Sequence, residues 1–483
     1  MAVMKTPGVY VVEKNAFPNS VVEAATAVPA FIGYTEKAAN GNKSLQNVPW
    51  RITSMAEYRT YFGGAPLPKF VLEEKGALTR QDKFTFYYNL MLFYANGGGA
   101  CYIVSVGDYS GDIEAAKLKD GIEPLKKEQE PTMVVIPEAV TLKDAADCYD
   151  VQQAMAQHCG YVMKNRFAIF DIYDGCKNRK DPDGDVIEKF RENIGSEFLD
   201  YGAAYYPWVN TSIVQENELS FLNFNIEELK KLLLKELEDS ALPDAKKTQI
   251  KGYIDGLKEG LSEVDQSTYH KVLSQTSPLY AQLMNDSRLL LNLLPVSAAM
   301  AGVYTLVDNS RGVWKAPANI SIATVVSPSV NISHEEQEDL NVPVNGKSVN
   351  AIRFFTGEGI KVWGARTLDG NSLDWRYINV RRTMLMLEES VKNAAKAYVF
   401  EANESNTWVN VKSMISNFLN GIWKRGGLAG AVPDDAYSVH VGLGETMTPE
   451  DILEGIMRIT VLVALVHPAE FIEITFQQQM QKS

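Results

Sequence analysis

Residues 84–106 read FTFYYNLMLFYANGGGACYIVSV, and this stretch decides the class of fold. Residues 84–94 are almost all apolar or aromatic and predict a helix with an apolar face. Asn96 and the three glycines after it predict the end of that helix. Residues 100–106 then predict a buried strand. A helix followed by a short glycine-rich stop and a strand is typical of a layered α/β protein.

The same alternation continues on both sides of this stretch. Upstream, residues 30–34 predict a buried strand and residues 55–62 a short helix that is closed by two glycines. Downstream, strands are predicted at residues 132–136, 167–171 and 203–208, with a helix at 145–163. Strands that alternate with helices favour a mixed α/β fold around a mostly parallel sheet.

A helical block interrupts this pattern at about residues 222–294. It opens with EELKKLLLKEL at residues 227–237 and continues with helical patterns at 244–261 and 269–294. Lysine and glutamate recur along these helices, as is typical of solvated helix faces. We expect a helical insertion on the surface of the protein.

The last third of the chain predicts a hairpin, then two long helices, and finally two strand-like segments. A hairpin is predicted at residues 352–363, and long helices are predicted at 377–397 and 407–423. Residues 459–466 predict a strand, and residues 471–476 predict another with one apolar face, before a polar tail. Both ends of the chain are thus short strand-like segments that lack apolar neighbours nearby in the sequence.

The composition of the chain limits the kinds of partner and the cellular compartment that we expect. The formal net charge is −13, which argues against a nucleic-acid partner, because binding a phosphate backbone requires a basic surface. The four cysteines form no CxxC pair, so we expect reduced thiols. No signal-peptide pattern and no apolar run of about 18 residues occurs. These features predict a protein that is made and folded in the cytoplasm and does not insert into a membrane.

Motifs for catalysis are incomplete. Residues 345–348 read NGKS, but position 341 is asparagine where a phosphate-binding loop needs glycine. His334 begins a zinc-protease pattern that fails at Glu338, and Ser333 with Glu336 predicts a helix capping box instead. The acidic turn at 181–185 lacks the glycine position of an EF-hand. We expect no catalytic residue, no metal site and no cofactor, and therefore no enzyme.

Short motifs spread along the chain occur in the order found in one family. They are TPGVYV (6–11), VPAFIG (28–33), ANGG (95–98), CYIV (101–104), PVSAAMAGVY (295–304), RGVWKAPAN (311–319), GIKVWGARTL (359–368), WRYINVRR (375–382), FEAN (400–403) and HPAEF (467–471). Together they resemble the contractile tail sheath family of phage tails, R-type pyocin-like particles and extracellular contractile injection systems. The helical block near 222–294 is longer than in compact members of that family.

The resemblance implies a fold and a division of the chain. The core sheath domain would be assembled from both chain ends, with an inserted α/β domain, a helical insertion and extended β-strand arms at both termini. The implied ranges are an N-terminal arm at 1–20, core segments at 21–110 and 346–466, of which the second faces the tube, an outer domain at 111–345 and a C-terminal arm at 467–483.

The resemblance also implies a function. The chain would form stacked six-fold rings around an inner tube, with baseplate and terminal cap proteins as further partners, and contraction would drive the tube through a target envelope. Neighbouring subunits would exchange strands through the arms, at Val9, Tyr10, Val11, Val12, Phe471, Ile472, Ile474 and Phe476. Candidates for electrostatic contact with the tube are Lys412, Lys424 and Arg425.

Other functions stay open at this point. A baseplate or cap-associated component of the same machine is one alternative, and a soluble α/β enzyme is another. The sequence does not distinguish a phage from a bacteriocin or a toxin injector.

Overall fold

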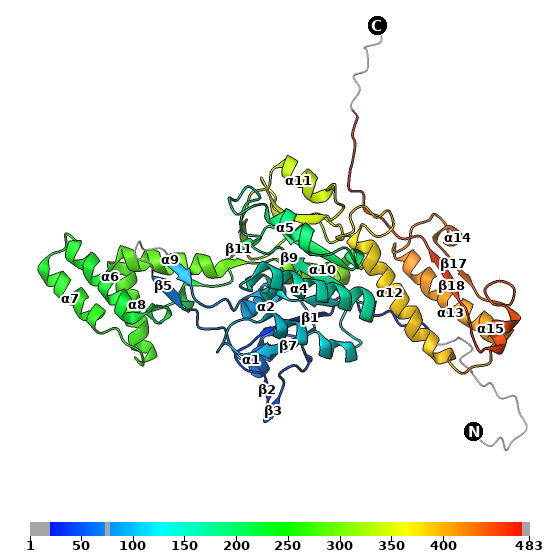
Figure 1. The fold of residues 1–483 in the computed structure, drawn as a ribbon, viewed down its shortest axis with the longest axis horizontal. Helices are drawn as coiled ribbons and strands as arrows, with labels where there is room; N and C mark the ends of the chain where they lie inside the picture. The colour runs from blue at the N-terminus through cyan, green and yellow to red at the C-terminus, as the bar shows by residue number, and fades with distance from the viewer. Residues whose placement is uncertain (1–19, 73–77, 476–483) are drawn as a thin grey trace, which may run out of the picture. The chain divides into compact units, whose positions relative to one another are not determined.

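The computed structural model describes residues 20–72 and 78–475 (Figure 1). Contacts divide the chain into two compact units, which we call unit 1 and unit 2. Unit 1 combines the residues up to Ala24 with Thr383–His467, and unit 2 combines Ala25–Arg382 with the residues from Pro468 onward.

Unit 2 is built on a nine-stranded sheet in the order β13-β16-β15-β10-β9-β8-β1-β7-β4. All neighbours from β15 to β7 run parallel, and the strands at both edges run antiparallel. The strands are β13 (Ile320–Ser321), β16 (Gly359–Trp363), β15 (Val349–Phe355), β10 (Gly202–Tyr206), β9 (Phe167–Asp171), β8 (Met133–Val135), β1 (Pro29–Tyr34), β7 (Cys101–Gly107) and β4 (Trp50–Ile52). The predicted mixed α/β fold with a mostly parallel sheet is confirmed.

Helices cover both faces of this sheet, so its central strands are apolar on both sides. Along β1, Phe31 points into one core with α2 (Phe86–Ala95) and α10 (Ser297–Arg311). Its neighbour Ile32 points into the other core with α3 (Ala115–Asp120), α4 (Ala145–Gln157) and α5 (Val186–Asn193). This three-layer arrangement explains why every residue of β1 is buried.

The predicted helical insertion is present as four helices, drawn in green in Figure 1. They are α6 (Ile226–Asp239), α7 (Asp244–Asp255), α8 (Glu263–Thr276) and α9 (Pro278–Asn292). The helical pattern expected over 269–294 is divided between α8 and α9, because Ser277 ends α8 and caps α9, and Pro278 occupies the first position of α9. Leu229, Leu233 and Leu237 form the buried stripe of α6.

Smaller elements complete unit 2. A three-stranded sheet joins β12, β11 and β14. These and the remaining elements are α1 (Met55–Phe62), β2 (Ala39–Asn40), β3 (Lys43–Ser44), β5 (Phe70–Leu72), β6 (Leu78–Arg80), β11 (Val209–Thr211), β12 (Leu293–Leu294), β14 (Val325–Pro328) and α11 (His334–Asn341).

Unit 1 packs the helix α13 (Ser405–Lys424) against the strand β17 (Tyr437–His440). The buried side of α13 presents Val411, Met414, Ile415, Leu419 and Ile422. The strand β18 (Thr460–Val463) pairs antiparallel with β17, so the strand predicted at 459–466 finds its partner there and not in residues 471–476. Two short helices, α14 (Pro433–Ala436) and α15 (Pro449–Leu453), lie in the connections.

The compact units differ from the domain ranges expected from the sequence. The expected boundary near residue 110 falls between β7 and β8, yet both strands pair directly with β1 in one sheet. The expected core segment 346–466 is divided within α12 (Ile378–Ala395), since β15 and β16 complete the sheet of unit 2. Sheet pairing between distant segments, rather than sequence order, sets these limits.

One ion pair is fully enclosed in unit 2. The guanidinium of Arg382, in α12, donates to both oxygens of Asp308, in α10, at 3.0 and 2.6 Å. The side chains are only 4% and 2% exposed. Arg382 also donates to the carbonyl oxygen of Thr26 and stacks on the ring of Tyr304. A charge so enclosed requires its partner.

A second buried charge site holds the end of β1 and the start of α2. The carboxylate of Glu138 accepts hydrogen bonds from the backbone N–H groups of Tyr34, Thr85 and Phe86 at 2.8, 2.9 and 3.1 Å. Burial raises the pKa of Glu138 to about 7, although the three backbone bonds act in the opposite direction.

The raised pKa of Glu138 predicts a pH-dependent stability. Between about pH 4.5 and 7 the folded protein holds a proton that the unfolded chain has released, so this group makes the free energy of unfolding fall as pH rises. The fall amounts to roughly 3 kcal/mol. Urea unfolding at pH 5 and pH 8 should show a smaller fall for Glu138→Gln than for the wild type. Glu192→Gln, at an exposed glutamate, should keep the wild-type fall, and a Glu138→Gln profile parallel to the wild type would contradict the assignment.

Candidate assembly surfaces

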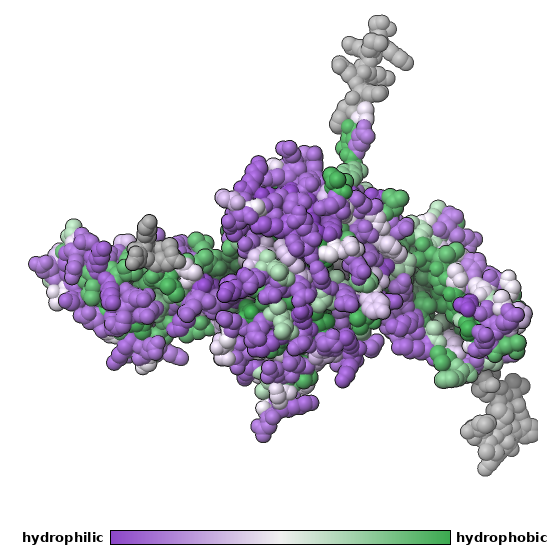
Figure 2. Space-filling view, in the orientation of Figure 1, coloured by the Kyte–Doolittle hydropathy of each residue, from purple (hydrophilic) through white to green (hydrophobic). Residues whose placement is uncertain are grey.

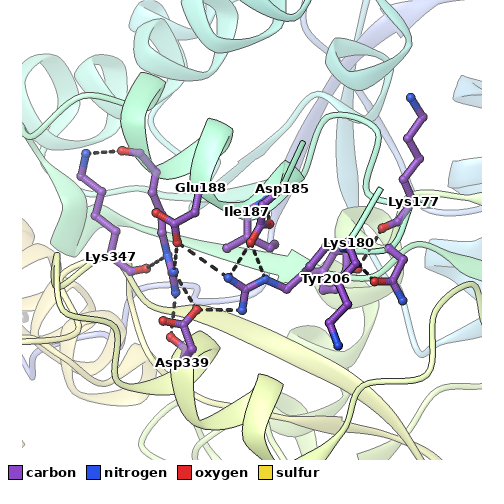
Figure 3. A network of polar contacts seen from close by, with 11 residues as sticks. Lys177, Lys180, Asp185, Ile187, Glu188, Tyr206, Asp339 and Lys347 are labelled. Carbon is purple, nitrogen blue, oxygen red and sulfur yellow. Dashed lines mark hydrogen bonds and ion pairs between the residues drawn. The ribbon is translucent and has the colours of Figure 1, made fainter. Parts of the chain in front are cut away.

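The most extensive charge cluster in unit 2 is structural. Arg191, whose side chain is 1% exposed, pairs with Glu188 and Asp339, and Arg179 pairs with Asp185 and Asp339 (Figure 3). Burial alone would raise the pKa of Asp339, but hydrogen bonds from the two arginines lower it below its usual range. The cluster therefore fastens α5 and the loop before it to α11, and its charges are satisfied by one another.

The motifs that were rejected from the sequence have structural roles. Ser333 and Glu336 form the predicted capping box at the start of α11. Asp185 caps α5 through the N–H of Ile187. Cys101, Cys148, Cys159 and Cys176 are unpaired, as expected. Over residues 20–72 and 78–475, no group of three or more metal-ligating side chains comes together, and no helix there has the length and apolar character to span a membrane.

Glu470 fastens the described part of the C-terminal segment to unit 2. Arg366 donates from Nε and Nη2 to the two carboxylate oxygens at 2.9 and 2.6 Å. Asn341 donates from Nδ2 at 2.8 Å, and the hydroxyl of Tyr377 donates at 3.0 Å. Burial alone would raise the pKa of Glu470, but the hydrogen bonds from Arg366 and Asn341 lower it. Glu470 therefore stays charged and bound.

The exposure of the side chains rises sharply between Glu470 and Phe471. Phe471, Ile472 and Ile474 are 75%, 78% and 70% exposed, whereas the side chain of Glu470 is 18% exposed. Residues 471–475 form no strand with any described segment of the chain. Hydrophobic residues accordingly lead into the grey C-terminal trace in Figure 2. Exposed apolar side chains on an extended segment indicate a surface that is covered by a partner.

The other residues expected to exchange strands cannot be placed. Val9, Tyr10, Val11, Val12 and Phe476 lie outside the described residues. The N-terminal segment enters unit 1 at residues 20–24, where Glu23 pairs with Arg425 and the N–H of Ala24 donates to Ser390 Oγ at 2.8 Å. The side chains of Arg425 and Glu23 are 50% and 36% exposed, so this fastening is more open to solvent than that of Glu470.

Unit 1 contains a small sheet. Among the described residues, β17 and β18 form a sheet of two strands, and just beyond β18 the N–H of Ala429 donates to the carbonyl oxygen of Ala464 at 2.8 Å. Such a pair has marginal stability alone, and its free edges can bind a further strand. Leu462 of β18 is 58% exposed, and hydrophobic residues reach the surface of unit 1 in Figure 2.

The three residues expected to contact the tube do not form one patch. Lys412, Lys424 and Arg425 are exposed on α13 or just after it. However, twelve positions separate Lys412 from Lys424, which places them about 18 Å apart along the helix and about 120° apart around it. Arg425 is also paired with Glu23. Contact with a tube stays a prediction for each of these residues.

Comparisons with known proteins agree with this geometry. Residues 371–479 match the model of the phage tail sheath C-terminal domain. The whole fold is similar to a chain of the contracted sheath complex of an extracellular contractile injection system, PVC. That likeness covers 99% of both chains at 27% identity, with a TM-score of 0.62. The chain therefore carries the C-terminal domain of phage tail sheath proteins and resembles a contractile sheath protein over almost its whole length. This sheath protein is also similar to a chain of the anti-feeding prophage (AFP) baseplate in its contracted state, with 25% identity over 99% of this chain and 100% of the other, at a TM-score of 0.67.

A curated relative matches over a shorter stretch. The tail sheath protein of Vibrio phage KVP40 is 26% identical over 164 residues, which are 33% of this sheath protein and 23% of the phage protein. The chain therefore aligns with less than a quarter of that relative.

Sequence reasoning missed the residues that hold Glu470. Arg366, Tyr377 and Glu470 each lay in a motif used for the resemblance, but none had been given a role. The separations of Asn341, Arg366 and Tyr377 from Glu470 are 129, 104 and 93 positions, and no local pattern signals such contacts.

Proposed function

We propose that this chain is a structural sheath subunit that polymerises as stacked six-fold rings around an inner tube and contracts to drive the tube through a target envelope. The observation that carries the proposal is the likeness over 99% of the chain to a sheath complex described in its contracted state. The subunit acts as a scaffold without catalysis, and its partners are further copies of itself, the tube protein, and baseplate and cap proteins.

Strand exchange holds the lattice together. The segment Phe471, Ile472 and Ile474 leaves unit 2 exposed, and β17 with β18 offers open edges in unit 1. A segment added to such an edge gains backbone hydrogen bonds, and its alternating side chains set the register. One copy therefore donates to the next in a head-to-tail contact, which builds rings and helices instead of closed dimers.

Contraction uses two packings of the same subunits. The bodies rotate as nearly rigid units while the exchanged strands stay paired, and the short segments at the arm roots absorb the change of backbone angles. The extended lattice is a kinetic trap that is set during assembly on the tube and baseplate. Firing therefore needs no nucleotide. Assembly takes place in the bacterial cytoplasm, and the finished particle leaves the cell as a unit.

A location at the baseplate end is a second candidate role. It is favoured by the likeness to the AFP baseplate chain, at a TM-score of 0.67. A subunit with this role would form a few rings in place of long cylinders.

The purified full-length chain is expected to form hollow cylinders as its concentration rises, because each subunit carries both a donor segment and an acceptor edge. Negative-stain electron microscopy together with sedimentation measures this directly. Short stacks of rings of fixed height would support the baseplate role. A protein that stays monomeric at high concentration, with no rings in micrographs, would overturn both roles.

A further inference from the structure

The root of the C-terminal segment is a preformed binding site for one carboxylate. Its donors come from three places in unit 2: Asn341 ends α11, Arg366 follows β16, and Tyr377 precedes α12. We call these three residues the Glu470 socket. Together they donate at least four hydrogen bonds to the carboxylate, at 2.6–3.0 Å.

The socket itself is held rigidly. The side chain of Arg366 is 4% exposed, and its Nη1 donates to the carbonyl oxygen of Gly370. The backbone N–H of Arg366 donates to Asn350 Oδ1 at 2.8 Å, and Asn350 belongs to the sheet strand β15. Asn341 is fixed through its carbonyl oxygen, which accepts from Ser348 Oγ at 2.7 Å. Bidentate arginine–carboxylate pairing restrains orientation as well as distance.

A strand that is donated to a neighbour needs such restraint. A slip of one residue in register turns every side chain to the opposite face of the sheet. Ile472 and Ile474 share one face of the segment, and Phe471 and Glu473 share the other. A root fixed one residue before Phe471 therefore decides which side chains meet the acceptor, and it raises the effective concentration of the segment at that acceptor.

We propose that Asn341, Arg366 and Tyr377 are positioning residues for assembly: by binding the Glu470 carboxylate they fix where the C-terminal segment leaves unit 2, so that the donated strand enters its neighbour in a single register. The proposal rests on the strand exchange proposed above. It assigns the socket no part in the contact between subunits, because its three side chains and that of Glu470 lie within one subunit.

The test compares full-length variants that differ by one charge or one side-chain shape. Glu470→Gln removes the charge and turns an amide N–H₂ group toward the donors of the socket. Arg366→Lys keeps the charge but loses the two-pronged geometry. Glu192→Gln is the matched control, because Glu192 is an exposed glutamate of unit 2 outside the donated segment. A chain that ends at Glu470 tests strand exchange itself.

We expect Glu470→Gln and Arg366→Lys to fold cooperatively and to raise the concentration needed for cylinders by about tenfold or more. Glu192→Gln should assemble like the wild type. Hydrogen exchange of unassembled protein should be faster at residues 466–475 in both socket variants and unchanged elsewhere in unit 2. A role confined to general stability would instead speed exchange throughout unit 2.

Three results would overturn the socket's role. In the first, both socket variants assemble like Glu192→Gln while the chain that ends at Glu470 does not assemble; strand exchange then survives and the positioning role fails. In the second, both socket variants lose their cooperative melt, which shows that the pair of Arg366 and Glu470 is needed for the stability of unit 2. In the third, the shortened chain still forms cylinders, and strand exchange fails together with the inference that rests on it.

Discussion

A chain that ends at Glu470 should fold like the full-length protein and form no cylinders. Among the described residues that it removes, the apolar ones, Phe471, Ile472 and Ile474, are 70–78% exposed and contribute nothing to either core. Glu470 and its socket remain. Circular dichroism should therefore show an unchanged, cooperative melt.

Assembly should fail because every contact along the lattice loses a strand. A strand of about five residues forms several hydrogen bonds, each worth roughly 0.5–1.5 kcal/mol net. The concentration needed for cylinders should rise by at least about a hundredfold. Sedimentation and negative-stain microscopy would measure the rise.

A full-length variant distinguishes the effect of losing the donated strand from the effect of shortening the chain. Ile472→Lys with Ile474→Lys keeps all 483 residues but charges the apolar face of the donated segment, and it should assemble as poorly as the shortened chain. Cylinders at the wild-type concentration from either protein would show that contacts between the bodies hold the lattice.

Removal of the buried arginine in α12 should destabilise unit 2 more than any surface change. Arg382→Leu leaves the Asp308 carboxylate, 2% exposed, without its partner, and such a loss typically costs about 3–5 kcal/mol. The stacking on Tyr304 and the bond to the Thr26 carbonyl oxygen are lost as well. Chemical denaturation would measure the effect as a lower midpoint.

Two comparisons make this prediction specific. Arg311→Leu removes an equal charge from the exposed end of α10, three residues after Asp308, and should change stability by less than about 0.5 kcal/mol. Adding Asp308→Leu to Arg382→Leu should recover part of the loss, because no unpaired charge then stays buried. Equal effects of Arg382→Leu and Arg311→Leu would contradict the enclosed ion pair.

Local patterns predicted most single elements of this fold. The helix expected at residues 55–62 is α1, and the strand expected at 167–171 is β9, since each is an apolar segment with clear stops at both ends. The helical pattern expected over 269–294 is present as two helices, and Ser277 with Pro278 is the local signal for the start of the second. The tail sheath resemblance came from ordered motifs and not from these patterns.

Contacts between distant segments could not be predicted in the same way. The limits of the compact units depend on which strands pair, and the partner of β18 is β17, not the segment after Glu470. The socket joins residues up to 129 positions apart. The helical spacing of Lys412 and Lys424, by contrast, already implied that these two residues lie on different sides of one helix.

Unit 1 draws on both extremes of the chain, and this affects its synthesis. Glu23 and Arg425 are 402 positions apart, so at typical translation rates of about 5–20 residues per second Glu23 leaves the ribosome roughly 20–80 s before Arg425. Meanwhile α13, β17 and β18 do not yet exist, and the nascent chain has no acceptor edge for the strands of finished copies. Under the proposed strand exchange, a nascent chain can therefore accept a strand only after β17 and β18 have been made, which delays lattice growth on a crowded polysome.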